Sequence, residues 1–409
     1  MKAGFAQEWF SPDHRLTPFG FGFRSTKFPP GNEGAEAPIG LSCTALQNED
    51  SGNDTLLLFS LDLAILFGDL AEHLRQTIAG ATDLPPQNIQ LACTHTHSAP
   101  LPALDPSQGE GAKISEFLPD DDPEAIRAFT DNLTQLAVRA AHRALGLLIP
   151  VRVRYQQALT GLGYQRRVPQ KPGQAPALCW NQEEFPHLSP PPSPDPWISV
   201  LLLEPLGGHE PFVLWGTGIH PVTLGKTSRL LSPDWPGATN RVLAGLLGTN
   251  RIAFFQGASG EVHPWLATGA ENKDLSLMAE AMAAQIRLLV RTARPWPEKK
   301  QSLWALAEGT LPLPEGRSLP LTLLRLGPFA APVLPLELFA SLAQSWRKSW
   351  AAPLLPITLA NGWQAYWPDQ QAFEEGGYEV EVARRYGRKS GDGEKLVAAY
   401  DQLFAKLFS

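Results

Sequence analysis

Residues 55–97 limit the possible folds of this chain more than any other stretch. An apolar run comes first at 55–62, apolar side chains then recur at helical spacing over 65–79, and a second apolar run follows at 88–94. Two consecutive prolines end the helical segment before the second run, because proline cannot continue a helix. This order predicts a strand–helix–strand unit, which is typical of α/β proteins.

The second apolar run stops at two histidines, His95 and His97. Side chains alternate between faces in an extended segment, so residues two apart share a side. We therefore expect both imidazoles to enter one pocket together. They could serve there as metal ligands or acid/base groups, or they could be ordinary hydrogen-bonded histidines.

Length and composition narrow the function classes. A chain of 409 residues can form one elaborate domain or two, and 43% apolar with 18% charged residues is typical of a globular protein. The net charge of -7 offers no basic surface and argues against nucleic acid as a partner. The oligomeric state cannot be read from this sequence.

Cysteine usage and hydropathy bear on the compartment. Cys43, Cys93 and Cys179 are widely spaced and odd in number, so they predict neither a disulfide framework nor a thiolate zinc motif. The first residues contain no apolar segment of signal-peptide length, and no stretch elsewhere is apolar enough to span a bilayer. We expect a cytoplasmic protein without stable membrane insertion.

Three later predicted strands also end at polar side chains. These strands and their terminal residues are 211–220 with His220, the hairpin strand 331–337 with Glu337, and 357–361, which leads through a short loop to Tyr366. We therefore expect an α/β fold: a single large domain with a mixed sheet core, flanking helices, and the active site at the carboxyl-terminal rim of the strands. Taken singly, Glu337 would more often be a surface acid and Tyr366 a packing residue.

Further helices and two long loops complete the prediction. Helices are expected at 123–145, 236–247, 274–293 and 391–407. In the third of these, we expect one side to pack against the core, namely Leu277, Ala281, Ala284, Leu288 and Arg291. The loops 98–121 and 168–196 lack periodicity and could form pocket walls or a lid. Arg166 and Arg167 lie on a loop after a strand, where exposed arginines are the ordinary interpretation.

The ordered set of polar strand ends resembles the neutral ceramidase family of zinc amidases, over nearly the whole chain. The matching segments are Thr94-His95-Thr96-His97-Ser98, which looks like the family's Thr-His-Thr-His-Ser signature; Ile219-His220-Pro221, like its His-Pro segment; Leu334-Pro335-Leu336-Glu337, like its Pro-Gly-Glu-Phe segment; and the spacing from Asn361 to Tyr366. The resemblance implies that residues 1–409 form one catalytic domain. It also implies one zinc ion bound by His95, His220, Glu337 and Tyr366, with His97 facing the scissile amide.

Two more positions resemble functional residues of the family. Arg166, in Tyr-Gln-Arg-Arg, looks like the arginine of the family's Asn-Arg-Ser segment. Tyr378 lies twelve residues past Tyr366, as the family's substrate-contacting tyrosine does. The resemblance implies that Arg166 and Tyr378 both donate hydrogen bonds to the developing oxyanion.

The chain departs from the family at its serine. The family's loop reads Gly-Asp-Val-Ser-Pro-Asn, whereas Gly260-Glu261-Val262-His263-Pro264 here puts His263 at the serine position and Ser259 four residues earlier. His263 could be a second acid/base group, a substrate contact or a further metal ligand. The family's C-terminal immunoglobulin-like domain has no counterpart either, which is the pattern of a divergent, bacterial-type member.

These features together predict a zinc-dependent hydrolase that is not a true ceramidase. We expect it to cleave an amide, lactam or ester bond of a small molecule by attack of zinc-activated water, with His97 as the acid/base group. Arg166 and Tyr378 would stabilise the oxyanion. The alternative is a non-catalytic protein of the same fold that binds zinc or another ligand. The substrate cannot be read from the sequence.

Overall fold

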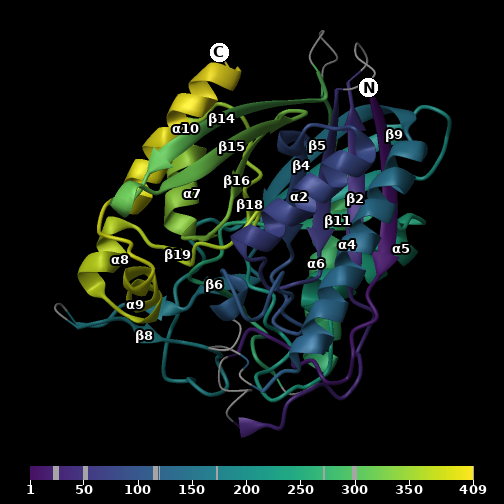
Figure 1. Ribbon diagram of the computed structural model, residues 1–409. Coiled ribbons are helices and arrows are strands. Elements are labelled where there is room, and N and C mark those ends of the chain that lie inside the picture. The colour runs from purple at the N-terminus through teal and green to yellow at the C-terminus, as the bar shows by residue number, and fades with distance from the viewer. Residues whose placement is uncertain are drawn as a thin grey trace.

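The computed structural model describes residues 1–21, 27–48, 54–113, 118, 120–171, 174–269, 272–296 and 302–408. Over these residues the chain forms four layers, in which two β-sheets pack face to face and α-helices cover the outer face of each sheet (Figure 1). The mixed sheet core with flanking helices confirms the predicted fold class.

The larger sheet has nine strands: β1 (Lys2–Trp9), β2 (Gly40–Gln47), β3 (Thr55–Leu61), β4 (Ile89–Cys93), β5 (Ile149–Leu159), β9 (Trp197–Pro205), β10 (Phe212–Thr217), β11 (Ile252–Gln256) and β13 (Arg294–Pro295). Their order is β11-β10-β9-β5-β1-β2-β3-β4, with β13 paired to β5. The pairs β3–β4 and β10–β11 are parallel, and the others are antiparallel. Neither β1 nor β2 is among the predicted strands, although both lie in the middle of this sheet.

In the described part of the chain, four helices cover the outer face of the larger sheet: α2 (Gly68–Thr82), α4 (Pro123–Gly146), α5 (Asp234–Leu247) and α6 (Asn272–Thr292). Helix α2 links the parallel strands β3 and β4, as the strand–helix–strand prediction requires. Helix α4 begins where predicted, because the Asp122 side chain accepts a hydrogen bond from Glu124 N and Pro123 suits the first turn.

The predicted core side of α6 is wrong. Leu277 and Leu288 are 57% and 63% exposed, whereas Met278, Met282 and Ile286 are buried against β9–β11. Small and apolar residues lie around most of this helix, so their spacing fits more than one buried side. Only contact with the sheet decides which side is covered.

The smaller sheet has the order β14-β15-β16-β18, with β14 (Trp304–Pro312), β15 (Ser318–Leu326), β16 (Phe329–Leu334) and β18 (Ile357–Thr358). The antiparallel pair β15–β16 confirms the predicted hairpin. Strand β14 is not among the predicted strands; its proline stands at the last position of an edge strand, where proline is tolerated. The outer face is covered by α7 (Ala340–Ser349), α8 (Gln370–Glu375), α9 (Tyr378–Arg385) and α10 (Asp392–Phe408), the last close to the predicted 391–407.

Short strand pairs and 3-10 turns complete the described part of the fold. They are the pairs β6 (Gly163–Gln165) with β12 (Val262–Pro264), β7 (Arg167–Val168) with β8 (Ala177–Leu178), and β17 (Glu337–Leu338) with β19 (Tyr366–Trp367), and the 3-10 turns Pro86–Asn88, Gly111–Lys113 and Pro314–Gly316. None of the helices in the described ranges is both long and apolar enough to cross a bilayer.

Residues 357–361 bring the two edge strands of the larger sheet together. Asn361 N donates to Leu91 O at 2.8 Å, and the Asn361 side-chain oxygen accepts from Leu91 N at 2.9 Å, which ties the segment to β4. Thr358 Oγ1 donates to Gly257 O at 2.8 Å, just past the end of β11. The ends of β4, β10, β11 and β16 therefore meet at one place in the molecule.

Candidate metal centre

Two histidines and a glutamate converge where β4, β10 and β16 end. His95 Nε2 lies 3.2 Å from His220 Nε2. Glu337 Oε2 lies 3.4 Å from His95 Nε2 and 3.5 Å from His220 Nε2. All three side chains are buried. The structure thus brings three of the four predicted zinc ligands into one cluster from three distant segments.

The remaining nitrogen of each ring fixes its orientation. His95 Nδ1 donates to Ala64 O at 2.8 Å and His220 Nδ1 donates to Ser259 O at 2.7 Å, since a carbonyl oxygen can only accept. Burial lowers the pKa of His220 to about 4, so this ring is neutral near pH 7. The Nε2 lone pair of His220 therefore points into the cluster, as in histidines that bind metals.

The spacing of these three atoms fits a tetrahedral metal ion. Ligand atoms about 2.0–2.1 Å from a tetrahedral zinc ion lie about 3.3 Å apart, close to the three separations measured here. Glu337 Oε1 accepts a hydrogen bond from Trp363 Nε1 at 3.0 Å, whereas buried Glu337 Oε2 accepts none from the described residues. Lone pairs this close repel one another unless a cation or proton lies among them, so the donor set fits a bound cation.

His97 adds a second possible ligand set. Its Nε2 lies 3.4 Å from His95 Nε2, and the rings of His95, His97 and His220 present nitrogens that all lie within 4.8 Å of one another. These three histidines could hold a metal ion without Glu337. Only a ligand set that includes Glu337, however, gives a role to Glu337 Oε2, which has no hydrogen-bond donor in the described part of the chain.

The route by which His95 and His97 meet differs from the extended segment that we expected. Strand β4 ends at Cys93, and His95 has a φ of +71°, a conformation that costs free energy in a residue with a side chain. Gly20 packs directly against the second imidazole. Its φ is +124°, and a Cβ at that position would lie 2.4 Å from His97 Cγ, so a larger residue there would displace the ring.

Tyr366 is held beside the cluster by its backbone. In the parallel pair β17–β19, Glu337 is the direct partner of Tyr366. The Tyr366 hydroxyl accepts from Arg166 Nη2 at 3.5 Å, and its ring centre lies 5.8 Å from that of Tyr378. Burial and the nearby Glu337 carboxylate raise the pKa of Tyr366 well above its usual range, against the opposing charge of Arg166. The phenol therefore stays protonated unless a bound cation lowers that pKa.

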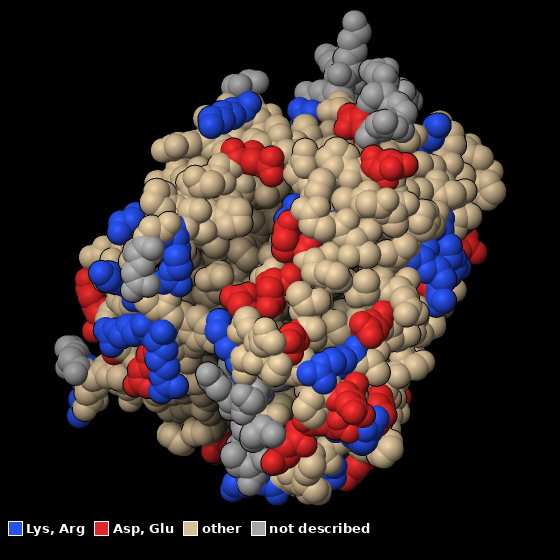
Figure 2. All heavy atoms as spheres, viewed as in Figure 1, with Lys and Arg blue, Asp and Glu red and all other residues tan. Residues whose placement is uncertain are grey.

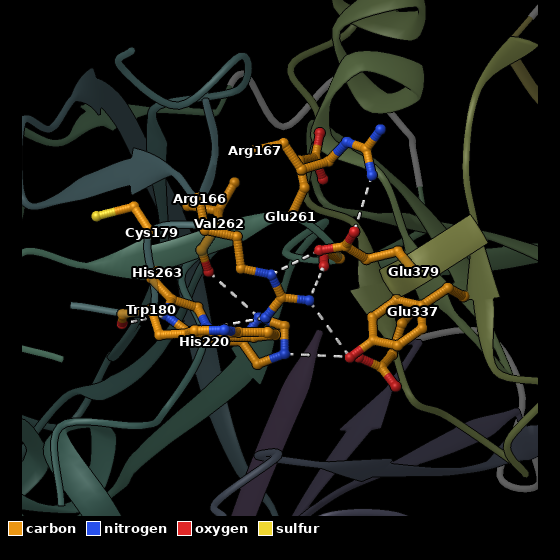
Figure 3. A network of polar contacts seen from close by, with 12 residues as sticks. Arg166, Arg167, Cys179, Trp180, His220, Glu261, Val262, His263, Glu337 and Glu379 are labelled. Atoms are coloured by element: carbon orange, nitrogen blue, oxygen red, sulfur yellow. Dashed lines mark hydrogen bonds and ion pairs between the residues drawn. The ribbon is translucent and has the colours of Figure 1, made fainter. Parts of the chain in front are cut away.

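Arg166 and Arg167 are buried, at 2% and 3% exposure, so the interpretation as exposed arginines is wrong. Figure 3 shows the Glu379 carboxylate bonded to both guanidiniums. Glu379 Oε1 accepts from Arg166 Nε at 2.8 Å, and Oε2 accepts from Arg167 Nη1 at 2.9 Å. Although burial opposes ionisation, these two cations keep the pKa of Glu379 below its usual value. The network fixes Arg166 behind Tyr366, because a buried pair is stable only when its charges stay matched.

His263 belongs to the same network. Its Nε2 accepts from Arg166 Nη1 at 2.8 Å, since a guanidinium can only donate, and its Nδ1 donates to Trp180 O at 2.9 Å (Figure 3). Burial and the charge of Arg166 lower the pKa of His263 well below its usual value. Both ring nitrogens are therefore engaged within the protein. A role in acid/base catalysis stays a prediction, and it would require the contact with Arg166 to break.

A cavity of about 740 Å³ opens onto the cluster. The predicted site residues that line its inner end are His95, His97, Glu337, Tyr366 and Tyr378. Arg166 and His263 are not among the described residues of its wall, and both are buried. Tyr378 is 43% exposed. His97 and Tyr378 are consequently the predicted catalytic groups that a bound molecule reaches directly.

Some positioning groups could not be found from the sequence. The carbonyls of Ala64 and Ser259 orient the two histidines, and no residue type marks a carbonyl for that task. Trp363 and Glu379 did carry a signal, since each lies within three residues of a predicted site tyrosine. Their partners, Glu337 and the two arginines, become apparent only in three dimensions.

Glu261 caps α7 from the loop that carries His263, and it leads to a prediction on stability. Its carboxylate accepts from Ala340 N at 2.9 Å, and burial raises the pKa of Glu261 to about 8. In the unfolded chain a glutamate ionises near pH 4.3. The folded state therefore holds the extra proton between those pH values, and stability falls as the pH rises through that window.

As the pH rises through that window, the free energy of unfolding of Glu261→Gln should fall less steeply than that of the wild type. The two slopes should differ by up to about 1.4 kcal/mol per pH unit. Urea unfolding at several pH values measures the free energy of unfolding for the variant and the wild type. Replacing an exposed acid, Glu210→Gln, provides the control and should leave the slope unchanged. Parallel slopes for wild type and Glu261→Gln would show that Glu261 is ionised in the folded protein.

Comparison with known proteins gives likeness in fold alone. No known family description matches the sequence, and no curated protein matches it. The neutral ceramidase from Pseudomonas aeruginosa is similar in structure, with a TM-score of 0.71 and 14% identity over 98% of this chain and 73% of that chain. A ceramidase complexed with C2 is similar too, with a TM-score of 0.70 and 14% identity over 98% of this chain and 74% of that one. The chain therefore has the neutral ceramidase fold, as its motifs predict.

Proposed function

We propose that this protein is a zinc-dependent hydrolase whose metal is held by His95, His220 and Glu337 and completed by Tyr366. The observation that carries the proposal is the convergence of two Nε2 atoms and a carboxylate oxygen that accepts no hydrogen bond from the described residues, beside a cavity. Two imidazoles and a carboxylate are typical of catalytic zinc sites. The ceramidase fold supports an amide, lactam or ester as the bond that is cleaved.

The chain's own groups have separate tasks in this proposal. A zinc ion at the centre would lower the pKa of water to around 7 and polarise the substrate carbonyl. His97 lines the cavity beside His95 and would take up a proton and return it to the leaving group. The Tyr378 hydroxyl would donate to the oxygen on which charge develops. Arg166 would act through its contact with Tyr366.

We also propose that no residue of the chain forms an acyl intermediate, and that the substrate is a small molecule other than ceramide. Ser259 supplies its backbone carbonyl to His220, which requires nothing of its hydroxyl. His263, at the position of the family's serine, has both ring nitrogens engaged. Neither side chain is therefore arranged as a nucleophile.

Metal analysis and a turnover screen test the proposal together. Elemental analysis should find about one zinc per chain, and anomalous scattering should place it within bonding distance of His95 and His220. N-acyl amines, lactams, small esters and ceramide are then assayed with zinc and with a chelator. We expect metal-dependent turnover of a compound other than ceramide.

Two results would contradict this proposal. A metal beyond bonding distance of both histidines would end the assignment of the ligands. Stoichiometric zinc without turnover of any compound would favour the alternative, a non-catalytic zinc-binding protein. Preferential turnover of ceramide would leave the hydrolase in place and refute only the choice of substrate.

A further inference from the structure

We propose that the substrate carries an acidic group, a carboxylate or a phosphate, at the end that lies farthest from the metal centre. This inference rests on the proposed function and names the substrate class. Among the described residues that line the 740 Å³ cavity are three cationic side chains, Lys113, Arg317 and Arg385. All three are exposed or partly exposed, whereas His95 and Glu337 of the metal cluster are buried, so the cations lie toward the solvent end of the cavity. Among its described lining residues the one acid is Glu337, at the inner end. The whole chain has more acids than bases, 41 against 34, so composition does not explain this excess.

The three cations come from separate parts of the fold. Lys113 ends a 3-10 turn, Arg317 precedes β15, and Arg385 is the last residue of α9. Arg317 lies beside Gly387, two residues past Arg385, because a Cβ at Gly387 would lie 3.5 Å from Arg317 Nη2. The Arg317 guanidinium thus reaches the end of α9. Figure 2 shows Lys and Arg gathered over α8 and α9 on this face.

The positive charge of these three side chains is poorly compensated by nearby acids. Within the described parts of the chain, neither Arg317 nor Arg385 forms an ion pair, and Lys113 Nζ lies 3.6 Å from partly exposed Glu110. Burial is the main cause that lowers the pKa of Arg388, and the charge of Asp392 opposes it. The charge of Arg317 lowers this pKa further, so its positive charge is felt by its neighbour. Clustered cations around a cavity attract an anion, and guanidiniums bind carboxylate or phosphate through two parallel hydrogen bonds.

Helix α9 sets the distance between the two ends of the substrate. Tyr378 begins the helix near Tyr366, and Arg385 ends it. Seven residues at 1.5 Å each separate them by about 10 Å. An extended chain covers roughly 1.2 Å per bond, so about eight bonds link the reacting carbonyl to the acidic group. Trp363 and Tyr386, whose rings meet edge-on at 5.1 Å, line the wall and suit an apolar linker.

A series of amides of graded length tests the inference on the zinc-loaded protein. The compounds are N-acetyl ω-amino acids from glycine to 8-aminooctanoate, their neutral primary amides, and N-acetyl amino alcohol phosphates of the same lengths. We expect kcat/KM to favour the long acids over their neutral partners by at least about 10-fold. The preference should shrink as salt concentration rises.

Substitution then tests whether the preference for acidic substrates depends on Arg317 and Arg385. The double variant Arg317→Gln, Arg385→Gln should lower the ratio of kcat/KM for acid over neutral amide by about 10- to 100-fold, mainly through KM. Both positions are exposed, so the fold should tolerate the change. Arg291→Gln, an exposed arginine of α6 outside the cavity, is the matched control and should keep the wild-type ratio.

Binding of non-hydrolysable analogues separates this inference from the proposed function. In these analogues a ketone replaces the amide, and calorimetry compares the acid with its neutral partner on the wild type and the double variant. Tighter binding of the acid that the double variant loses supports the inference, even if no compound is turned over. Equal binding of acid and neutral analogues overturns it, even if neutral amides are hydrolysed. Preference for the phosphate or for the carboxylate series identifies the acidic group.

Discussion

The His220→Ala variant is expected to bind zinc more than about 100-fold more weakly than the wild type and to lose metal-dependent hydrolysis. Loss of a group that only orients a ligand already costs roughly 10- to 100-fold in metal affinity. His220 does more, because its Nε2 is one of the three atoms that form the cluster. Competition against a chromogenic chelator measures the affinity.

Companion variants separate the two possible ligand sets. Glu337→Gln should weaken zinc binding strongly if its carboxylate is a ligand, and should leave it unchanged if His95, His97 and His220 hold the metal. Trp363→Phe removes the hydrogen bond to Glu337 and should cost roughly 10- to 100-fold in affinity. The exposed His209→Ala is the control. Undiminished affinity in His220→Ala would exclude both ligand sets.

Replacing His97 by alanine should lower kcat by roughly 10²- to 10⁴-fold, the usual effect of losing a general acid/base group. Ser259→Ala should keep most of the activity, because the backbone carbonyl that holds His220 survives the substitution. Steady-state kinetics on a substrate from the screen measures both effects. Zinc content decides the interpretation for His97, since a catalytic group that is not a ligand leaves the metal bound.

Mass spectrometry during turnover provides the independent check on this mechanism. Direct attack by water predicts no covalent adduct on the chain. An acyl group trapped on Ser259 or His263 would refute it, as would loss of activity in Ser259→Ala with zinc still bound. Retained activity in His97→Ala would move the proton transfer to another group.

Helices and strands whose apolar residues recur at a regular spacing could be predicted, because that spacing reflects which side chains are buried. β3, α2 and β4 occur close to their predicted bounds for this reason. β1 has no such regular period, and its place in the sheet depends on pairing with strands distant in sequence. β2 alternates only over Leu41 to Ala45, a signal too short to have been predicted as a strand. For α6 the helix was predictable and its buried side was not, because only the sheet beneath it decides which side is covered.

The candidate site divides in the same way. His95, His220 and Glu337 were expected together because each follows a predicted strand and because their order resembles the motifs of the neutral ceramidase family. Which nitrogen of each imidazole carries the proton could not be predicted, because it depends on the carbonyl that faces Nδ1. The burial of Arg166 was likewise unpredictable, since Glu379 neutralises its charge from 213 residues away.

The hydrogen bonds between Leu91 and Asn361 join residues 270 positions apart. The candidate metal cluster therefore lies beside a contact between β4 and residues 357–361, here called the seam. Closing so long a loop costs conformational entropy, so contacts across the seam depend on the rest of the fold having formed. A metal ion bound by His95 and Glu337 would tie the two sides of the seam together. Metal occupancy and closure of the seam then share one equilibrium, so a substitution that loosens residues 357–361 would release the ion while every ligand remains in the chain.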